Sequence, residues 1–254
     1  MAERPSVSVV MATYNGAAYV EEQLASVLEQ LRASDEVVVV DDASTDATAD
    51  VVAGLDDPRV RLVRSPANRG YVRTFEAAIR ESSGEAVLLA DQDDVWLPRH
   101  VEVLVDALQE HRVAASNLRV LGTGAGLQGP SGKPGWELRA ADSDRRLANL
   151  AGLLAGVRPY YGCAMAVRRD ALDVALPFPA WLDESHDLWL AAYGNLAGSI
   201  AHVEEPTVLR RLHADNQTPV RPRGVLPAVR SRLMLLRAVV ELRRRISRSA
   251  RTGR

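Results

Sequence analysis

Three carboxylates stand within four positions at the end of an apolar run, in the stretch Asp91-Gln92-Asp93-Asp94. Like charges this close raise one another's pKa and cost stability unless a positive charge lies between them. A divalent cation with oxygen ligands would supply that charge. The alternative is a solvated loop that offers a spare N-cap to the helix expected from Pro98. These residues by themselves leave both interpretations open.

The acids follow a strand in a chain where strands and helices alternate. Apolar and valine-rich runs predict strands at 7–10, 37–40, 60–63 and 86–90. Helical spacing and capping residues predict helices at 17–31, 44–55, 71–82 and 98–111. This order predicts an α/β fold whose mostly parallel sheet is built from right-handed βαβ units.

Polar residues follow three of the predicted strands. These groups are Thr13-Tyr14-Asn15, Asp41-Asp42 and Asp91-Gln92-Asp93-Asp94. In an open parallel sheet, ligands bind beyond the carboxyl ends of the strands. We therefore expect the three groups to converge on one crevice. Asp41 and Asp42 could also cap the helix that follows them, and one can do so while the other contacts a ligand.

The second half of the chain is less regular. A stretch rich in Gly and Pro at 122–135 predicts a loop. It contains a literal GxGxxG pattern at 124–129, but the residues after it include Pro130 and Pro134 and cannot form the helix that a dinucleotide site requires. Further elements are predicted as a helix at 144–156, a strand at 160–167, a helix following 183, and a strand at 200–211 before the polar turn 213–217.

The composition is that of a soluble globular protein. The 254 residues suit one large or two small domains, and 47% hydrophobic with 25% charged residues fits neither a disordered chain nor a membrane bundle. Cys163 is the single cysteine, so no intramolecular disulfide can form and a reducing compartment is expected. The first residues do not resemble a secretory signal. A cytoplasmic location is therefore predicted.

The charge is unevenly distributed along the chain. Residues 219–254 contain eleven arginines and one acid, so this tail carries +10 while residues 1–218 carry −12. Apolar residues recur at helical spacing in the tail, at Val225, Val229, Leu233, Leu236 and Val240. A basic amphipathic helix over 225–246 predicts peripheral contact with an anionic membrane, at the inner face of the plasma membrane. The alternative is a helix packed on the domain with solvated arginines. Nucleic acid is not an expected partner, because the acidic body lacks a continuous basic surface.

Several stretches together give the chain a family likeness. VSVVMATYN, VVVVDDASTD and VLLADQDDVW resemble the inverting glycosyltransferases of family 2, which have the GT-A fold. Further stretches at 161–165, 186–190 and 209–213 resemble the branch that includes many bacterial rhamnosyltransferases. The likeness spans roughly residues 5–218. It implies a GT-A domain at 1–218 with a Rossmann-like, mixed and mostly parallel sheet flanked by helices, divided into a nucleotide-sugar-binding half at 5–112 and an acceptor-binding half at 113–218. The basic helical tail at 219–254 follows from its charge and apolar spacing.

The resemblance implies a set of donor-binding residues. Thr13, Tyr14 and Asn15 would cradle the base, and Asp42 would accept a hydrogen bond from the imide N–H of uracil or thymine. A UDP- or dTDP-sugar is therefore the expected donor, with dTDP-L-rhamnose as one candidate. Asp91 and Gln92 would also bind the nucleotide-sugar, with Asp91 at the ribose.

The resemblance also implies a metal and a phosphate contact. Asp93 and His213 would bind Mn²⁺ or Mg²⁺, and the metal would stabilise the charge that develops on the diphosphate leaving group. A histidine ligand suits Mn²⁺ somewhat better, although His213 could also be an exposed turn residue. Many members have Arg-Asn where this chain has Phe75-Glu76. The phosphate role is therefore assigned to Arg73, with Arg69 as a second candidate.

The implied general base is Asp187, at the start of a helix. It would remove the proton of the acceptor hydroxyl as that oxygen attacks the anomeric carbon, and a helix N-terminus favours its ionised form. The alternative is that Asp187 only caps the helix. His186 could be a substitute base or an acceptor contact, and Trp189 is expected in the core. The expected acceptor is a glycan, a lipid-linked sugar or another glycoconjugate.

Two other functions remain as alternatives. A sugar nucleotidyltransferase of related fold would show a Gly-rich, Arg-containing signature, and none follows Val10. A noncatalytic module that binds sugar-nucleotides would not need Asp187. Donor-dependent transfer or hydrolysis separates these possibilities.

Overall fold

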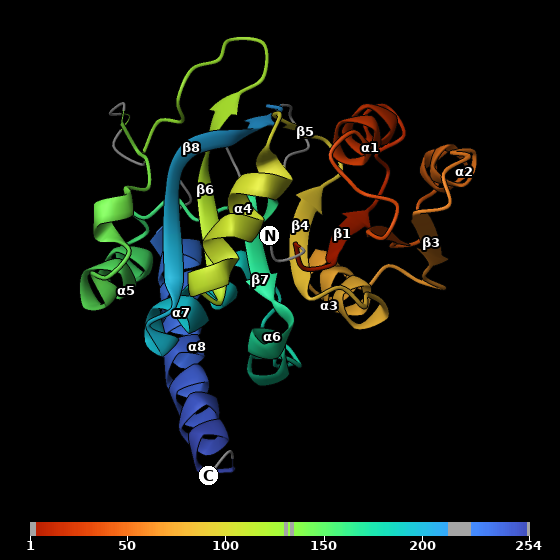
Figure 1. Ribbon diagram of the computed structural model, residues 1–254. Helices are drawn as coiled ribbons and strands as arrows, with labels where there is room; N and C mark the ends of the chain where they lie inside the picture. The colour runs from red at the N-terminus through yellow and green to blue at the C-terminus, as the bar shows by residue number, and fades with distance from the viewer. Residues whose placement is uncertain (1–3, 130–131, 133–134, 213–224, 253–254) are drawn as a thin grey trace.

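The computed structural model describes residues 4–129, 132, 135–212 and 225–252. Within these residues one eight-stranded sheet forms the centre of the molecule, with the order β3-β2-β1-β4-β7-β6-β8-β5 (Figure 1). The strands are β1 (Val7–Thr13), β2 (Glu36–Asp41), β3 (Val60–Arg64), β4 (Ala86–Asp91), β5 (Val95–Trp96), β6 (Val113–Val120), β7 (Met165–Arg168) and β8 (Ile200–Arg210). The helices are α1 (Val20–Leu28), α2 (Thr48–Ala53), α3 (Tyr71–Glu81), α4 (His100–Glu110), α5 (Arg146–Ala155), α6 (Arg169–Ala175), α7 (His186–Ala197) and α8 (Val225–Thr252).

The sheet is mixed, with a parallel half built from the first strands of the chain. β1 pairs in parallel with β2 and β4, and β2 pairs in parallel with β3. This 3-2-1-4 order is the one found in Rossmann-like sheets, as expected. β7 runs antiparallel to β4 and β6, whereas β6 and β8 are parallel. In register, Thr13 pairs with Asp41, and Ala12 pairs with Asp91. The three predicted polar groups therefore begin at the same edge of the sheet.

Helices cover both faces of the sheet, because alternate strand residues point to opposite sides. In β1, Val10 packs in a core with α3, α5, α6, α7 and α8, whereas Val9 packs in a second core with α1, α2 and α4. Figure 1 shows α1 and α3 on opposite sides of β1. Burial on both faces explains why the valine run of β2 shows no polar alternation.

The distal half departs from the sequence-based expectation in three elements. The strand expected at 160–167 begins only at Met165, after a short 3₁₀ helix at Gly162–Ala164. Neither β6 nor α6 was predicted. The first six residues of β6 are all buried, so the strand lacks the apolar and polar alternation by which a half-buried strand is recognised.

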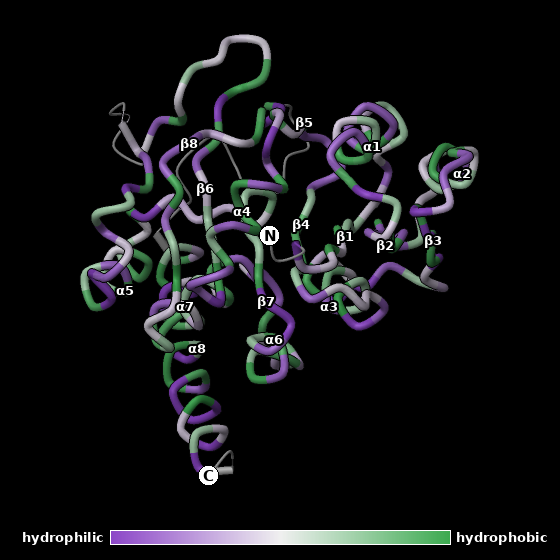
Figure 2. Tube along the Cα trace, viewed as in Figure 1, coloured by the Kyte–Doolittle hydropathy of each residue, from purple (hydrophilic) through white to green (hydrophobic). Residues whose placement is uncertain are grey.

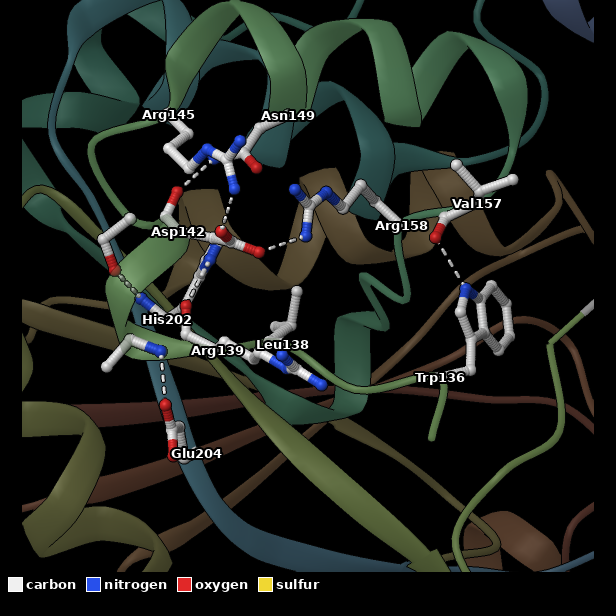
Figure 3. A network of polar contacts seen from close by, with 12 residues as sticks. Trp136, Leu138, Arg139, Asp142, Arg145, Asn149, Val157, Arg158, His202 and Glu204 are labelled. Atoms are coloured by element: carbon white, nitrogen blue, oxygen red, sulfur yellow. Dashed lines mark hydrogen bonds and ion pairs between the residues drawn. The ribbon is translucent and has the colours of Figure 1, made fainter. Parts of the chain in front are cut away.

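A polar network fixes the segment before α5 against β8 (Figure 3). Asp142 accepts a hydrogen bond from Arg158 at 2.9 Å. Glu204 of β8 accepts the backbone N–H of Ala140 at 2.9 Å. The distal half is thereby tied to the same sheet that carries the three polar groups.

The C-terminal helix α8 packs on the domain, but through a side that the sequence did not indicate. Leu235, Ala238 and Leu242 are fully buried in the core shared with α7. Four of the apolar residues on which the tail prediction rested lie on another side and are 48% to 62% exposed, namely Val229, Leu233, Leu236 and Val240. In the part of the chain that the structure describes, no helix is both long enough and apolar enough to cross a membrane.

Candidate active site at the strand ends

The loop after β1 and the loop after β4 are joined through one side-chain amide. The N–H of Tyr14 donates to Oε1 of Gln92 at 2.9 Å, and Nε2 of Gln92 donates to the carbonyl oxygen of Tyr14 at 3.0 Å. Gly16 makes room for this pair, because a Cβ at this position would lie within 2.7 Å of Nε2 of Gln92. The structure therefore brings the predicted donor-binding residues Tyr14 and Gln92 together.

The loop after β1 is also tied to the loop after β2. Asn15 has a positive φ of 48°, a conformation that Asn tolerates better than most residues. Its Oδ1 accepts the N–H of Thr45 at 2.8 Å, and its own N–H donates to Oγ of Ser44 at 3.0 Å. The hydroxyl of Thr13 donates to Asp41 at 3.2 Å. The first two predicted polar groups are thus adjacent.

Asp41 and Asp42 have different partners. Asp41 accepts the N–H and the hydroxyl of Ser44, at 3.0 and 2.5 Å, and so stabilises the turn that leads to α2. The two oxygens of Asp42 accept the N–H groups of Arg69 and Gly70, both at 2.9 Å, and so hold the loop before α3. An ionised carboxylate has about four acceptor sites. Asp42 can therefore keep these bonds and still accept one from a base, and that role stays a prediction.

Asp91 and Asp94 form an acidic group with Cys163. The potential ligand atoms of these three residues lie within 4.8 Å of one another. Burial raises the pKa of Asp91 well above its usual value, and the charges of Asp94 and Asp93 raise it further. Burial, followed by the charge of Asp93, raises the pKa of Asp94 to about 6. The repulsion expected from the sequence is therefore present, and Asp94 is the acid that is fully buried.

A buried guanidinium faces this acidic group. Arg210, the last residue of β8, is 8% exposed, and its positive charge lowers the pKa of both Asp91 and Asp94. Its Cζ lies 4.8 Å from the centre of the Tyr161 ring, a cation–π distance. Arg210 and Tyr161 were not among the predicted site residues. The available signal was an arginine at the end of the strand predicted at 200–211, after the apolar pair Val208-Leu209.

Asp187 lies close enough to these charges to interact with them. Ser185 is the N-cap of α7, so Asp187 stands in the first turn and is not the cap. Its carboxylate accepts the N–H of Leu188 at 2.8 Å. Burial raises the pKa of Asp187 to about 6, whereas the backbone N–H groups and Arg210 lower it. The helix N-terminus favours the ionised form as expected, but burial has the larger effect. The charge of Asp187 in turn raises the pKa of Asp91.

Arg73, the predicted phosphate contact, has a structural role that the sequence did not indicate. Its guanidinium donates to Oε2 of Glu76 at 2.8 Å and to the carbonyl oxygens of Phe178, Pro179 and Leu182, at 2.9, 2.5 and 3.1 Å. These bonds clamp the 178–182 segment to α3. A contact between Arg73 and a diphosphate would compete with these bonds, and it stays a prediction.

The neighbours of Asp187 on α7 belong to the core. His186 is 4% exposed, stacks on Phe75 with ring centres 4.3 Å apart, and has its pKa lowered by burial to about 3. A neutral, buried imidazole of this kind is a poor substitute for the base. Trp189 is fully buried, as expected, and its indole N–H donates to the carbonyl oxygen of Ala175 at 3.0 Å.

The acidic group has the chemistry of a divalent-cation site. The buried Oδ2 of Asp94 has no hydrogen-bond partner within the described residues, and carboxylate oxygens are ligands for Mg²⁺ and Mn²⁺. Burial raises the pKa of the Cys163 thiol, and sulfur suits these ions less well. Asp93 is not part of the clustered group, and its carbonyl oxygen accepts a hydrogen bond from Arg211 at 3.0 Å. Its predicted metal contact stays a prediction. His213 lies outside the described residues.

Two relatives show what proteins the chain resembles in sequence. It is 36% identical over 119 residues to the succinoglycan biosynthesis protein ExoO of Rhizobium meliloti, a match that covers 46% of this chain and 34% of that protein. It is 28% identical over 108 residues to the UDP-Glc:α-D-GlcNAc-diphosphoundecaprenol β-1,3-glucosyltransferase WfgD of Escherichia coli, over 42% of this chain and 43% of that one. The matched region thus spans less than half the length of either relative.

Two solved structures share the architecture. TarS 1–349 of S. aureus in complex with UDP-GlcNAc superposes with a TM-score of 0.68 and 21% identity, over 91% of this chain and 66% of that one. The mannosyltransferase PcManGT from Pyrobaculum calidifontis, in complex with GDP-Man and Mn²⁺, gives a TM-score of 0.60 and 21% identity, over 99% and 77%. These likenesses confirm the GT-A-like fold.

A family model matches residues 8–174, which include the parallel half of the sheet from the second residue of β1 onward, with its three polar groups. The match covers well over half of the chain and agrees with the architecture. The chain belongs to glycosyl transferase family 2.

Proposed function

We propose that this protein is a metal-dependent, inverting glycosyltransferase that transfers a sugar from a UDP- or dTDP-sugar to a hydroxyl group of its acceptor. The observation that carries the proposal is the electrostatic interaction between Asp187 of α7 and Asp91 of β4, with Arg210 acting on both. The geometry agrees, because a Cβ at Gly162 would lie 3.6 Å from Cβ of Asp187, and the next residue, Cys163, belongs to the acidic group with Asp91. The proposed base and the proposed donor-binding acid are therefore near one another. A noncatalytic protein that only binds sugar-nucleotides would not need a general base beside the donor site.

The donor would lie along the three tied loops. Asp42 accepts the imide N–H of the base, next to Thr13 and the Tyr14–Gln92 pair, and Asp91 contacts the ribose. The solved structure that contains UDP-GlcNAc supports a uridine nucleotide, whereas the one with GDP-Man shows that this fold also accepts guanine. The candidate dTDP-L-rhamnose rests on the rhamnosyltransferase-like stretches at 161–165, 186–190 and 209–213.

The acids at the end of β4 would hold the metal. Asp93 is the proposed ligand, with His213 completing the site, and the clustered oxygens of Asp91 and Asp94 fit the same ion. When bound, Mn²⁺ or Mg²⁺ would neutralise the charge that develops on the leaving diphosphate. The Mn²⁺ in a structural neighbour supports a divalent ion.

Asp187 would act as the general base. Its carboxylate takes the proton of the acceptor hydroxyl while that oxygen bonds to the anomeric carbon, on the face opposite the diphosphate. The bond between that carbon and the diphosphate oxygen breaks, so the configuration inverts. A base with a pKa of about 6 is mostly ionised at neutral pH and still accepts a proton readily.

The acceptor is proposed to be a hydroxyl of a growing surface polysaccharide, either a glycan or a lipid-linked sugar. WfgD, by its name, acts on a sugar linked to diphosphoundecaprenol, and ExoO takes part in succinoglycan biosynthesis. These relatives support a lipid-linked or polysaccharide acceptor. The enzyme would then work in the cytoplasm, at the inner face of the plasma membrane, with its basic tail at the lipid surface.

A donor screen followed by a transfer assay tests the proposal. We expect UDP- or dTDP-sugars to raise the melting temperature in the presence of Mn²⁺ or Mg²⁺, because a ligand that binds only the folded state stabilises it. Nucleoside diphosphate release should depend on the same donor and metal, and NMR of the product should show an inverted anomeric centre. Transfer that persists in chelator would refute the metal requirement, and a retained configuration would refute the single-base mechanism. Donor binding with neither transfer nor hydrolysis would favour the binding module.

A further inference from the structure

The exposed side of α8 carries a row of apolar side chains that nothing in the described part of the chain covers. Its members, 48% to 82% exposed, are Leu226, Val229, Leu233, Leu236 and Val240. Steps of three and four residues place them on one side of the helix. At 1.5 Å per residue the row is about 21 Å long. A contiguous exposed apolar surface of this kind marks an interaction site.

This exposed row is not the side by which α8 packs on the domain. Leu235, Ala238 and Leu242 point the other way and are fully buried. The helix is therefore apolar on two sides, and in Figure 2 hydrophobic and hydrophilic residues alternate along it. The domain covers only one of the two apolar sides of α8. Docking of the helix on the domain does not account for the exposed row.

Arginines border the exposed row along both flanks. From Val225 to Thr252 the helix contains eight arginines and one acid, Glu241, for a net charge of +7. By helical geometry Arg230, Arg237 and Arg244 lie along one flank, and Arg232 and Arg243 along the other. The acid already pairs with Arg245 at 3.0 Å. Arg230 also pairs with Asp183 at 2.9 Å, and Arg237 lies over the ring of Trp181, so part of this charge faces the domain. The flanks of the row nevertheless keep a net positive charge.

A second copy of the chain would be a poor occupant. The row has the spacing of a coiled-coil seam, in which the residues beside the seam face those of the partner helix. In a parallel pair Arg232 would face Arg237 of the other copy, and in an antiparallel pair with the two rows overlapped Arg230 would face Arg237 of the other copy. Like charges across such a contact are destabilising. The apolar row and its flanking arginines together favour a partner surface that is both apolar and anionic.

We propose that the exposed row of α8 docks on the surface of an anionic lipid bilayer. The apolar side chains enter the boundary between headgroups and acyl chains, and the flanking arginines contact the lipid phosphates. The helix lies in the plane of the surface and holds the domain on the membrane. This inference rests on the proposed function for its purpose, which is to bring the crevice to a lipid-linked acceptor. Its test needs neither donor nor acceptor, so the two can fail independently.

Sedimentation of the full chain with vesicles tests the proposal. We expect binding to vesicles of phosphatidylcholine with phosphatidylglycerol, much weaker binding to pure phosphatidylcholine, and weakening by salt. The double substitution L233E/L236E should reduce binding more than about tenfold, because two apolar contacts are lost and negative charge is added. Both residues are exposed, so the fold should be kept. The matched control is L147E, which alters an exposed leucine of α5 that is 83% exposed and should leave binding unchanged.

The outcomes separate the possible occupants. Failure of the wild-type chain to bind anionic vesicles overturns the proposal. Equal loss of binding in L147E and L233E/L236E overturns it as well, because the effect would then not belong to the exposed row. Light scattering that shows a dimer in the wild type and a monomer in L233E/L236E, with no vesicle binding, assigns the row to a second copy.

Discussion

The guanidinium of Arg210 lies over the ring of Tyr161, with Cζ 4.8 Å from the ring centre, and from there its charge acts on Asp91 and Asp94. The positive charge that the acidic run requires is thus supplied in part by the end of β8, a distant strand in the sequence. A bound divalent cation would add to this charge.

Removing this charge should destabilise the protein. Arg210→Met leaves the buried acids uncompensated, and breaking a buried ionic group in this way typically costs about 3–5 kcal/mol. Chemical denaturation should show a loss of this order, partly recovered in Arg210→Met/Asp94→Asn. The control Arg112→Met, whose side chain is 46% exposed and pairs with Asp170 at 3.7 Å, should cost under about 1 kcal/mol. Equal stability of the Arg210 variant and the wild type would refute the role of Arg210.

Replacing the proposed base should abolish transfer and spare the donor site. Asp187→Asn keeps the shape of the side chain but cannot accept the proton, so we expect kcat to fall by about 10²–10⁴ while the Kd for the donor changes little. Nucleoside diphosphate release and titration calorimetry measure the two quantities. Asp183→Asn is the control, because its carboxyl is 59% exposed and pairs with Arg230 outside the crevice. Transfer that survives in Asp187→Asn would place the base elsewhere.

The pKa of Asp187 predicts how kcat/KM should fall at acidic pH. Burial raises the pKa of Asp187 to about 6, so the base is protonated below that pH. We expect kcat/KM to fall about tenfold per pH unit below pH 6 and to level off above it. Because Arg210 lowers the pKa of Asp187, the limb should move to higher pH in Arg210→Met. A limb near pH 4, or one that the Arg210 variant does not move, would contradict the electrostatic arrangement.

The ionised carboxylate of Asp187 should also destabilise the folded state at neutral pH. Its pKa is about 6 when folded and close to 3.8 when unfolded, so the folded state binds more protons between these values. The protonated carboxyl of Asp187 therefore makes its full contribution to the free energy of unfolding below pH 4. That contribution is lost as the pH rises through 6. The free energy of unfolding of Asp187→Asn should exceed that of the wild type by up to about 3 kcal/mol at pH 7.5 and should equal it at pH 4. Calorimetry at the two pH values checks this, and a variant that is less stable at pH 7.5 would contradict it.

A methyl group at Gly16 should disrupt the donor site. Its Cβ would lie within 2.7 Å of the Gln92 amide nitrogen, so Gly16→Ala displaces the amide and breaks both bonds to Tyr14. Each hydrogen bond contributes about 1 kcal/mol, and we expect donor affinity to fall about tenfold or more. In the Gln92→Ala background the same substitution should cost little. If Gly16→Ala alone binds donor normally, the Tyr14–Gln92 pair does not shape the site.

Much of the parallel half follows from local sequence. The runs before Thr13, Asp41 and Asp91 are apolar, and the first two are rich in valine, so each predicts a buried strand without reference to its neighbours in the sheet. The alternation of strands and helices then places their carboxyl ends at one edge. The apolar runs and the alternation of strands and helices are enough to predict that the polar groups lie close together.

The distal half and the fine structure of the site could not be read in this way. β6 is buried on both faces and lacks a polar alternation, and the exposed and buried sides of α8 are both apolar in sequence. Periodicity shows that a helix has an apolar side, but it does not show which side the domain covers.

By itself the sequence determined the strands of the parallel half, the acids that end them and the family to which they point, because these depend on neighbouring residues. Only the tertiary structure decided that Arg210 faces the acids, that Asp94 is the most deeply buried of them, and that burial sets the pKa of Asp187. These facts depend on groups far apart in the chain. Desolvation and charge interactions are set by distances in space, and those distances exist only once the sheet has assembled.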